Sequence, residues 1–367
     1  MSDQNTPNND QFTYAKSGVD INAQKSAHKI IGELITKTYL FRQGKFGEII
    51  GEYGHYAGLI DIGNELCLAM HVDGVGTKVM IAQMMNKYDT IGIDLIAMHA
   101  NDLICMGAEP VALEDYLAIE TVNNDVIYQI MKGLVEGAKQ AQMAIIGGET
   151  AIMPDIIKGT SPGNGLDLSG MSIGVVNKKN VITGSNIKIN DTIIGIMSSG
   201  IHSNGYTLAR KAFFDLAKLS PFDPLPNYPD LIVGNELLKP TKIYVQPILS
   251  LLKKFNDKIH GLAHITGGAF TKLNRLRPHG HDFGFLLNNL PKAPPIFKEI
   301  QNITNISDKE MYKTFNMGIG FCIIADPSIQ NEIINLLDNF NFSSLIIGKI
   351  IKSNKIILHL NENKIFL

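Results

Sequence analysis

Tryptophan is absent from this sequence, and cysteine occurs only three times, as Cys67, Cys105 and Cys322. The cysteines are scattered in apolar stretches without paired spacing, so we expect buried, reduced thiols rather than disulfides or a cysteine metal site. No apolar run reaches the roughly 20 residues that a membrane-spanning helix needs. The N-terminus also lacks the apolar core of a signal peptide, and we interpret residues 1–12 as a disordered leader of a cytoplasmic protein.

An excess of one charge is missing as well. The chain has 33 lysines and arginines against 35 aspartates and glutamates, with no sustained basic block. Proteins that bind nucleic acid or an anionic membrane through electrostatics carry such a block, so we expect neither partner. With 45% hydrophobic residues among 367, the chain can bury more than one compact core. We predict two domains, 13–180 and 181–367, that meet at the polar run 177–180.

The chain is organised around the stretch His-Val-Asp-Gly-Val-Gly-Thr-Lys at 71–78. The apolar run before it predicts a buried strand that stops at Asp73. The two glycines let the backbone come close to a ligand, and Thr77 can cap a following helix. Together with Lys78 this loop suits a metal-bound phosphate, although its spacing excludes a Walker A loop. The alternative is a tight strand-to-helix turn without a ligand.

A helix predicted at 90–107 carries three polar residues among isoleucine, leucine, alanine and methionine. Asp94 and Asn101 lie seven residues apart, hence near one helical face, and Asp102 is beside them. A solvent-exposed face would ordinarily carry lysines and glutamates instead. These residues therefore either face a ligand or satisfy one another in a polar network inside the core.

A third carboxylate follows a strand predicted at 144–146, which is expected to end in Gly-Gly-Glu-Thr-Ala. Glu149, Asp73 and Asp102 would make a set of hard oxygen ligands, of the kind that Mg²⁺ takes together with phosphate oxygens and water. Their separation along the chain neither supports nor excludes such a meeting.

The second half contains two more units in which a strand, a glycine turn and a helix follow one another. A strand at 191–197 leads into Ser-Ser-Gly-Ile-His-Ser-Asn-Gly-Tyr, and the turn Thr-Gly-Gly heads a helix that ends at Leu276. Such helix N-termini offer unpaired backbone N–H groups to an anion. His202 is a candidate general acid or base, or a hydrogen-bonding group for a substrate; a structural role is the alternative. Four prolines within 221–229 predict an extended connector.

The hydrophobic pattern predicts alternating strands and helices, typical of an α/β or α+β fold. Strands are predicted at 57–62, 66–72, 110–119, 144–146, 169–176, 191–197, 283–287, 317–325, 344–350 and 354–360. Helices are predicted at 23–38, 90–107, 124–141, 296–302 and 328–339.

Taken together, the motifs have a familiar order along the chain. They are Tyr14 with Gly-Val-Asp-Ile at 18–21, Asp-Gly-Val-Gly-Thr-Lys at 73–78, Gly-Ile-Asp-Leu-Ile-Ala-Met at 92–98, Asn-Asp-Leu at 101–103, Gly-Gly-Glu-Thr-Ala at 147–151, Ser-Ser-Gly-Ile-His-Ser-Asn-Gly-Tyr at 198–206, Pro-Thr-Lys-Ile-Tyr-Val at 240–245, His-Ile-Thr-Gly-Gly at 264–268 and Met-Tyr-Lys-Thr-Phe-Asn-Met-Gly-Ile-Gly at 311–320. The sequence resembles the phosphoribosylformylglycinamidine cyclo-ligases, the aminoimidazole ribonucleotide synthetase family of purine biosynthesis.

The resemblance implies two α/β domains with mixed sheets and flanking helices, the N-terminal one binding ATP and forming a homodimer. It implies ATP-dependent cyclisation of formylglycinamidine ribonucleotide to aminoimidazole ribonucleotide, with ATP and Mg²⁺ as cofactors. The cofactor-binding residues it implies are Asp73, Gly74, Gly76, Thr77, Lys78, Asp94, Asn101, Asp102, Gly147, Gly148, Glu149 and Thr150, with Asp73, Asp102 and Glu149 on the metal. The substrate side would be Gly200, His202, Ser203, Asn204, Thr266, Gly267 and Gly268, and the catalytic residues Lys78, His202 and Asn204.

The chain departs from the family pattern at several positions. Ala15 follows Tyr14 where a lysine or arginine is common, Ile152 replaces a glutamate, and the loop at 155–165 is unusual. Selenophosphate synthetase and thiamine-monophosphate kinase remain the enzymatic alternatives, because they share the nucleotide-binding half. A non-catalytic nucleotide-binding regulator would explain the glycine turns but not three metal-type acids.

Overall fold

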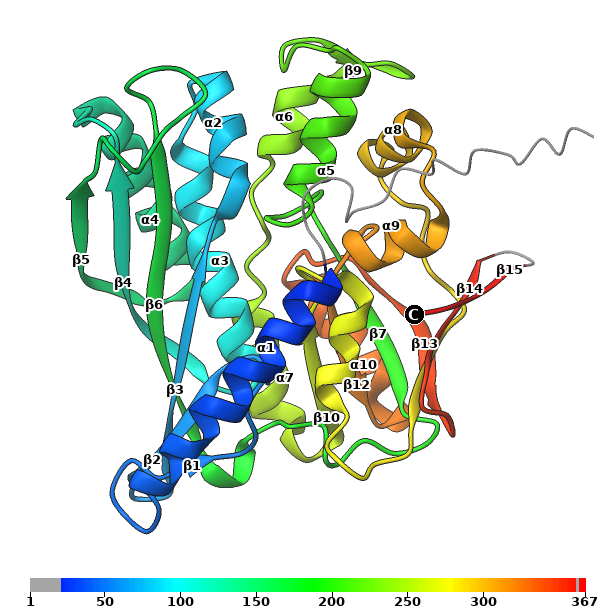
Figure 1. Cartoon of the computed structure of the whole chain (residues 1–367). Coiled ribbons are helices and arrows are strands. Elements are labelled where there is room, and N and C mark those ends of the chain that lie inside the picture. The colour runs from blue at the N-terminus through cyan, green and yellow to red at the C-terminus, as the bar shows by residue number, and fades with distance from the viewer. Residues whose placement is uncertain (1–20, 361–362) are drawn as a thin grey trace, which may run out of the picture.

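A computed structural model describes residues 21–360 and 363–367 of the chain. The predicted leader and the positions Tyr14 and Ala15 lie outside the described residues. Two mixed sheets with flanking helices make up the rest, as the pattern of strands and helices predicts (Figure 1).

The N-terminal sheet has six strands. Their order across the sheet is β1 (Ile49–Ile50), β2 (Gly58–Gly63), β3 (Leu66–Gly74), β6 (Leu166–Asn177), β4 (Glu109–Ile119) and β5 (Ala144–Ile152). Only β4 and β5 run parallel; the other neighbours are antiparallel.

One prediction for this sheet is wrong. The strand expected to end at Ile146 continues through Gly-Gly-Glu-Thr-Ala to Ile152, because these residues keep pairing with β4. A register shift after Leu113 brings Tyr116 opposite Glu149 and preserves the ladder. The glycines of this motif therefore lie in an edge strand and not in a turn.

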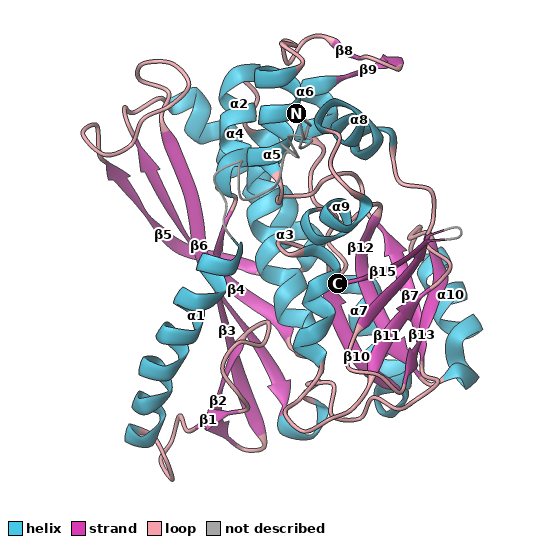
Figure 2. Ribbon diagram, turned by 45° about the vertical axis from the view of Figure 1, so that its right-hand side comes forward, coloured by secondary structure: helices cyan, strands magenta, loops and turns pink. Residues whose placement is uncertain are grey.

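Helices α2 (Val79–Met85), α3 (Asp89–Cys105) and α4 (Asn124–Ala141) cover one face of the sheet (Figure 2). Helix α3 is predominantly apolar and is buried along nearly its whole length. It packs closely on α4 because glycines stand at the contact. A Cβ on Gly92 would lie 2.4 Å from the Ile130 carbonyl oxygen, and one on Gly133 would lie 2.0 Å from that of Asp89. Thr77 does not cap α2, which continues from a short 3₁₀ turn, η3 (Gly76–Lys78).

The C-terminal sheet has seven strands. Their order is β10 (Ile259–His264), β12 (Ile319–Ala325), β7 (Thr192–Met197), β13 (Ser344–Ile351), β11 (Gly284–Leu287), β14 (Ile356–Leu360) and β15 (Asn363–Phe366). Around it lie α5 (Tyr206–Arg210), which continues as a π-helical turn, η5 (Lys211–Leu216), then α6 (Val233–Leu238), α7 (Val245–Phe255), the 3₁₀ helix η7 (Ala269–Leu276), α8 (Pro295–Thr304), α9 (Asp308–Thr314) and α10 (Gln330–Asn339). The proline-rich segment is not an extended connector: β8 (Pro224–Leu225) pairs with β9 (Tyr228–Ile232) as a small hairpin.

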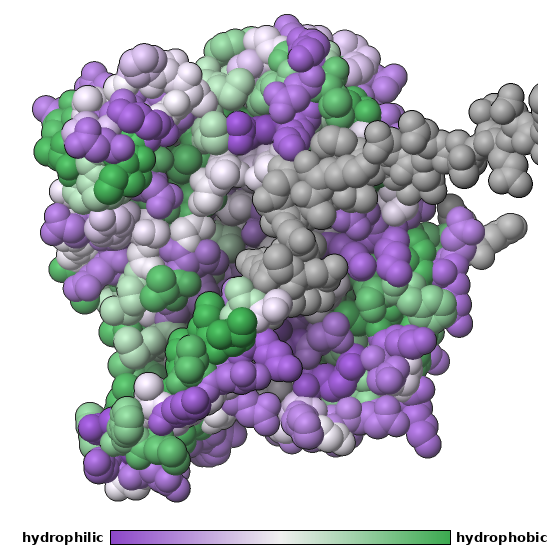
Figure 3. Space-filling view, in the orientation of Figure 1, coloured by the Kyte–Doolittle hydropathy of each residue, from purple (hydrophilic) through white to green (hydrophobic). Residues whose placement is uncertain are grey.

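Helix α3 lies between the two sheets and packs against β10 and α7 of the C-terminal half (Figure 1). The chain passes between the halves at η4 (Lys178–Asn180), near the boundary predicted at 180. At the N-terminal end, α1 (Ile21–Ile35) and η2 (Thr36–Phe41) leave large apolar side chains exposed, and hydrophobic surface gathers over α1 in Figure 3. These side chains are Ile30, Ile31, Leu34, Ile35, Leu40 and Phe41.

Candidate active site

Lys78 is not free to reach a phosphate. Its Nζ lies 2.6 Å from Asp94 Oδ2 and donates to the Lys239 carbonyl oxygen at 2.7 Å, and both side chains of the pair are 0% exposed. Asp94 Oδ1 in turn accepts hydrogen bonds from the backbone N–H and hydroxyl of Thr241. The lysine and aspartate predicted to bind a nucleotide form a buried ion pair, whose hydrogen bonds reach Lys239 and Thr241 of the other half. Their role toward a nucleotide stays a prediction.

Asn101 belongs to the same interface between the halves. Its Nδ2 donates to the Lys242 carbonyl oxygen at 2.8 Å, and its Oδ1 accepts from the Tyr244 N–H at 2.9 Å. The side chain is fully buried. Asp94 and Asn101 thus take part in a polar network between segments of the chain, as one of the two interpretations of helix 90–107 expects.

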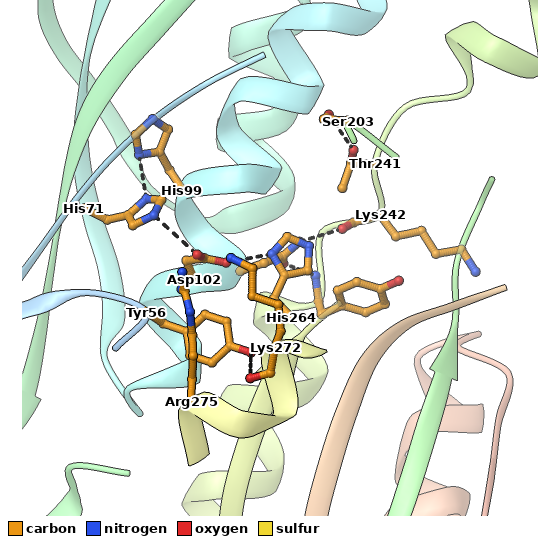
Figure 4. Close-up of polar contacts among 12 residues, drawn as sticks. Tyr56, His71, His99, Asp102, Ser203, Thr241, Lys242, His264, Lys272 and Arg275 are labelled. Carbon is orange, nitrogen blue, oxygen red and sulfur yellow. Dashed lines mark hydrogen bonds and ion pairs between the residues drawn. The ribbon is translucent and has the colours of Figure 1, made fainter. Parts of the chain in front are cut away.

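Asp102 lies between two histidines (Figure 4). Its Oδ1 is 2.8 Å from His264 Nδ1, and its Oδ2 is 3.3 Å from His71 Nε2. Burial alone would raise the pKa of the Asp102 carboxyl, but the hydrogen bonds from the two histidines outweigh it and hold the pKa well below its usual range. The network extends from His71 Nδ1 to His99 Nδ1 at 3.3 Å. Asp102 is thus an ionised carboxylate whose two oxygens are both engaged.

The three predicted metal ligands do not converge. Across the sheet, Asp73 of β3 pairs with Gly170 of β6, and Gly170 pairs with Asp115 of β4. Asp115 in turn pairs with Gly148 of β5, the residue before Glu149. Glu149 is therefore three strands from Asp73, about 14 Å at the usual strand spacing. Among the described residues, no group of three His, Cys, Asp or Glu side chains could hold a metal ion.

Asp73 and Asp102 do lie close to each other. Burial raises the pKa of Asp73, opposed by the hydrogen bond from the Gly74 N–H and assisted by the Asp102 charge. Asp102 is engaged by two imidazoles, whereas the Asp73 carboxylate accepts a hydrogen bond from the neighbouring Gly74 N–H. The other predicted cofactor residues, Gly76, Thr77, Gly147, Gly148 and Thr150, are exposed.

The two glycine turns predicted to bind the substrate meet each other. A Cβ on Gly267 would lie 2.7 Å from Asn204 Oδ1. Asn204 Nδ2 is buried and has no hydrogen-bond partner in the described part of the chain. An unpaired buried amide costs free energy, so its presence at the contact of two predicted substrate loops points to a missing acceptor. Thr266 and Gly268 belong to the same turn, in which Ala269 N–H donates to the Thr266 carbonyl oxygen.

His202 is held as a neutral imidazole. Its Nε2 accepts from the Ser199 N–H at 3.2 Å, which leaves the proton on Nδ1, and that nitrogen is buried without a partner among the described residues. Burial, followed by the charge of His264, lowers the pKa of His202 well below its usual range. Ser203 bonds the Thr241 hydroxyl, and the Gly200 carbonyl oxygen accepts from Asn316 Nδ2. His202 is therefore arranged to donate a hydrogen bond from Nδ1 as a neutral ring. It is not arranged to take up a second proton and become charged.

Sequence reasoning missed four residues of this region: His71, His99, His264 and Lys272. His71 and His264 stand in the motifs that drew attention to their loops, so proximity to a motif was the available signal. His99 and Lys272 carry no signal in the sequence, because their partners lie on other elements.

Comparisons with known proteins agree with this architecture. Residues 54–176 match the family model "AIR synthase related protein, N-terminal domain", and residues 188–361 match the corresponding C-terminal domain. A phosphoribosylformylglycinamidine cyclo-ligase of Methanocaldococcus jannaschii is 46% identical over 353 residues, which cover 96% of this chain and 95% of that protein.

Solved structures with lower identity share the fold. A thiamine-monophosphate kinase of Stenotrophomonas maltophilia superposes with a TM-score of 0.59 at 18% identity, covering 88% of this chain and 93% of that one. PurL of Thermotoga maritima, solved in complex with ATP, gives a TM-score of 0.56 at 13% identity, covering 90% of this chain and 47% of that one. In the described residues no helix has the length and apolar character to cross a membrane. Because both domain models match and one relative is 46% identical over almost the full length of both chains, this chain belongs to the phosphoribosylformylglycinamidine cyclo-ligase family.

Proposed function

We propose that this protein is an aminoimidazole ribonucleotide synthetase of purine biosynthesis, which closes the ring of formylglycinamidine ribonucleotide at the expense of ATP. The observation that carries this proposal is the 46% identity to a cyclo-ligase over 96% of the chain. The alternative, a thiamine-monophosphate kinase or selenophosphate synthetase, is not favoured: the kinase neighbour has only 18% identity.

The site supports ring closure by its arrangement at the boundary between the two halves. The end of β3, with Asp73, approaches Asp102 on α3, and Asp102 contacts His264, two residues before the Thr-Gly-Gly turn. The nucleotide loop and the substrate turns are thereby joined through one carboxylate. A phosphoryl group can pass between two ligands only when both are held in contact, which such a junction favours.

The chemistry needs an activated oxygen, because an amide oxygen is a poor leaving group. Transfer of the γ-phosphoryl group to the formyl oxygen breaks its bond to ADP and makes the oxygen part of a phosphate. Attack of the amidine nitrogen on that carbon then forms the C–N bond and releases inorganic phosphate. Asn204 Nδ2 and the Nδ1–H of His202, both unpartnered donors among the described residues, would orient the substrate and stabilise developing negative charge.

ATP is supported as the nucleotide by its presence in the fold neighbour PurL. Mg²⁺ normally binds through one or two carboxylates together with phosphate oxygens and water. Asp73 is the side chain on this chain that fits that role, with Asp102 beside it. Glu149 stays a predicted ligand without a place in this arrangement.

A homodimer through the N-terminal sheet is part of the proposal. Helices cover one face of this sheet (Figure 2), and its other face exposes apolar side chains. A sheet face of this kind is ordinarily covered by another layer, and a second copy of the chain would supply one. The exposed residues are Met70, Val72, Val111 and Tyr116.

The test of the reaction is whether ADP forms only when formylglycinamidine ribonucleotide is added. Substrate labelled with ¹⁸O in the formyl group should deliver its label to inorganic phosphate, one for one with the product. ADP formation without that substrate would contradict the proposed reaction. Label recovered in water would replace the phosphorylated intermediate by direct dehydration.

A further inference from the structure

Two cations stand on one side of η7, directly after the Thr-Gly-Gly turn. Lys272 and Arg275 are three residues apart, which places their side chains together on a 3₁₀ helix. Both reach toward Asp102 in Figure 4. The Lys272 Nζ lies 5.9 Å and the Arg275 Cζ 5.0 Å from the centre of the Tyr56 ring, which is buried. The two positive charges therefore share one aromatic neighbour.

Neither cation is neutralised by an ion pair. Within residues 21–360 and 363–367, neither side chain has a carboxylate at ion-pair distance. Burial, followed by the charge of Arg275, lowers the pKa of Lys272 to about 8. The nearest acids are Asp73 and Asp102, and Asp102 is already held by two histidines. Two like charges brought together away from water are unfavourable unless an anion joins them.

The position of these cations fits a gap in the proposed site. Lys78, expected to neutralise the transferring phosphoryl group, is locked in its ion pair with Asp94. Lys272 is the lysine that lies near Asp73 and Asp102, at the end of a turn predicted to hold the substrate. Arg275 also lines a cavity of about 530 Å³, together with Tyr53 and His55. The cavity reaches Arg275, and Lys272 stands beside it over the same Tyr56 ring.

We propose that Lys272 and Arg275 form a binding site for a phosphate group, which bridges the two side chains above Tyr56. This inference rests on the proposed function for the source of that phosphate: the triphosphate of ATP or the 5′-phosphate of the ribonucleotide substrate. A lysine supplies a point charge and an arginine a planar pair of donors, a combination suited to a tetrahedral oxyanion.

The experiment measures ligand binding without turnover, by isothermal titration calorimetry. ATP with Mg²⁺ and ribose 5-phosphate are titrated separately into the full-length wild type, Lys272→Met and Lys272→Arg. We expect Lys272→Met to weaken one of the two ligands roughly ten- to a hundredfold, the usual value of a charge-assisted contact, and Lys272→Arg to restore much of it. Loss confined to ATP assigns the site to the nucleotide, and loss confined to ribose 5-phosphate assigns it to the substrate. Arg275→Gln should weaken the same ligand.

The matched control is Lys253→Met on the exposed surface of α7, which should leave both affinities unchanged. Thermal unfolding without ligand separates binding from structure: because Lys272 is an uncompensated cation, Lys272→Met should unfold at the wild-type temperature or above it. Unchanged affinity for both ligands in a folded Lys272→Met variant would overturn the inference. Because these titrations involve no turnover, that result would not contradict the proposed reaction. Conversely, failed cyclisation with intact phosphate binding would contradict the proposed reaction and leave the phosphate site supported.

Discussion

Lys78 and Asp94 form an ion pair that is closed to solvent on both sides, with 2.6 Å between Nζ and Oδ2. The lysine follows the central glycine motif, and the aspartate lies on α3, yet their remaining hydrogen bonds go to residues 239 and 241 of the other half. Because the hydrogen bonds of this pair join the two halves, we expect the loss of either side chain to lower the free energy of unfolding first of all.

Replacing Lys78 by Met should therefore destabilise the protein. Removal of one partner leaves the Asp94 charge buried and unpaired, which costs about 3–5 kcal/mol. The free energy of unfolding from urea denaturation checks this, with Lys87→Met as a surface control whose own ion pair is partly exposed. A Lys78→Met variant of wild-type stability that has lost ATP binding would return this lysine to the nucleotide site.

Asn101→Ala should also lose stability without losing nucleotide affinity. The change strands the Lys242 carbonyl oxygen and the Tyr244 N–H, each a buried group worth about 1–3 kcal/mol when unpaired. Urea denaturation gives the stability, and the KM for ATP of the variant at a temperature where it remains folded gives the affinity. A raised KM at unchanged stability would support the role first predicted from the sequence.

Gly267→Ala should act on the substrate rather than on ATP. The added methyl group would stand 2.7 Å from Asn204 Oδ1 and would displace that amide. We expect the KM for the ribonucleotide to rise roughly tenfold, equivalent to about 1.4 kcal/mol, with the KM for ATP unchanged. Gly58→Ala is the control, because its Cβ would meet only the Met70 carbonyl oxygen at 3.9 Å. Equal effects on both KM values would mean that the turn does not discriminate between the ligands.

Stability should fall as the pH drops below about 6.5, in part because of His99. Burial, followed by the charge of His71, lowers the pKa of His99 from 6.5 to about 3. Between these values the unfolded chain binds a proton that the folded protein refuses, so each pH unit costs about 1.4 kcal/mol. His99→Gln should flatten the fall between pH 6 and 4 by about that slope. The exposed His279→Gln change should leave the pH profile of the unfolding free energy as it is.

A charge on the open face of the N-terminal sheet should separate the proposed dimer. Val72 is 72% exposed on β3, and a Val72→Glu variant would place a carboxylate in the proposed interface. Sedimentation should then report the monomer mass. Val135→Glu on α4, at a site 63% exposed on the other side of the sheet, should remain dimeric. A wild type that sediments as a monomer at every concentration would refute the dimer itself.

Much of the fold could be predicted, because local pattern and tertiary structure agree where elements are long. Helix 124–141 has the bounds predicted from the sequence, and helix 90–107 is displaced by one or two residues at its ends. The strand at 144–146 was predicted too short, because glycines ordinarily interrupt strands, and only the pairing with β4 keeps this one extended. The hairpin at 224–232 was missed for a similar reason. Its prolines indicated an extended connector, although two short edge strands pair there.

The candidate site was predictable in its loops but not in its contacts. The two glycine turns were predicted to bind one ligand, and the structure brings them together. The hydrogen-bond partners of Asp94 and Asn101 in the other half, Thr241 and Tyr244, lie more than 140 residues away. A polar residue in an apolar helix indicates that its side chain has a hydrogen-bond partner. The spacing of residues along the chain does not indicate whether that partner is a ligand or another segment of the protein.

The position of α3 between the sheets restricts how the protein can move. Parting this helix from residues 239–244 would remove the hydrogen bonds that Lys239 and Thr241 make to the Lys78–Asp94 ion pair, and it would strand the backbone groups that Asn101 satisfies. A hinge motion that separates the two halves therefore costs free energy. We expect the two sheets to move as one rigid body during the catalytic cycle. Entry and exit of ligands would then depend on loops, such as the loop at 153–165, which has no helix or strand of its own.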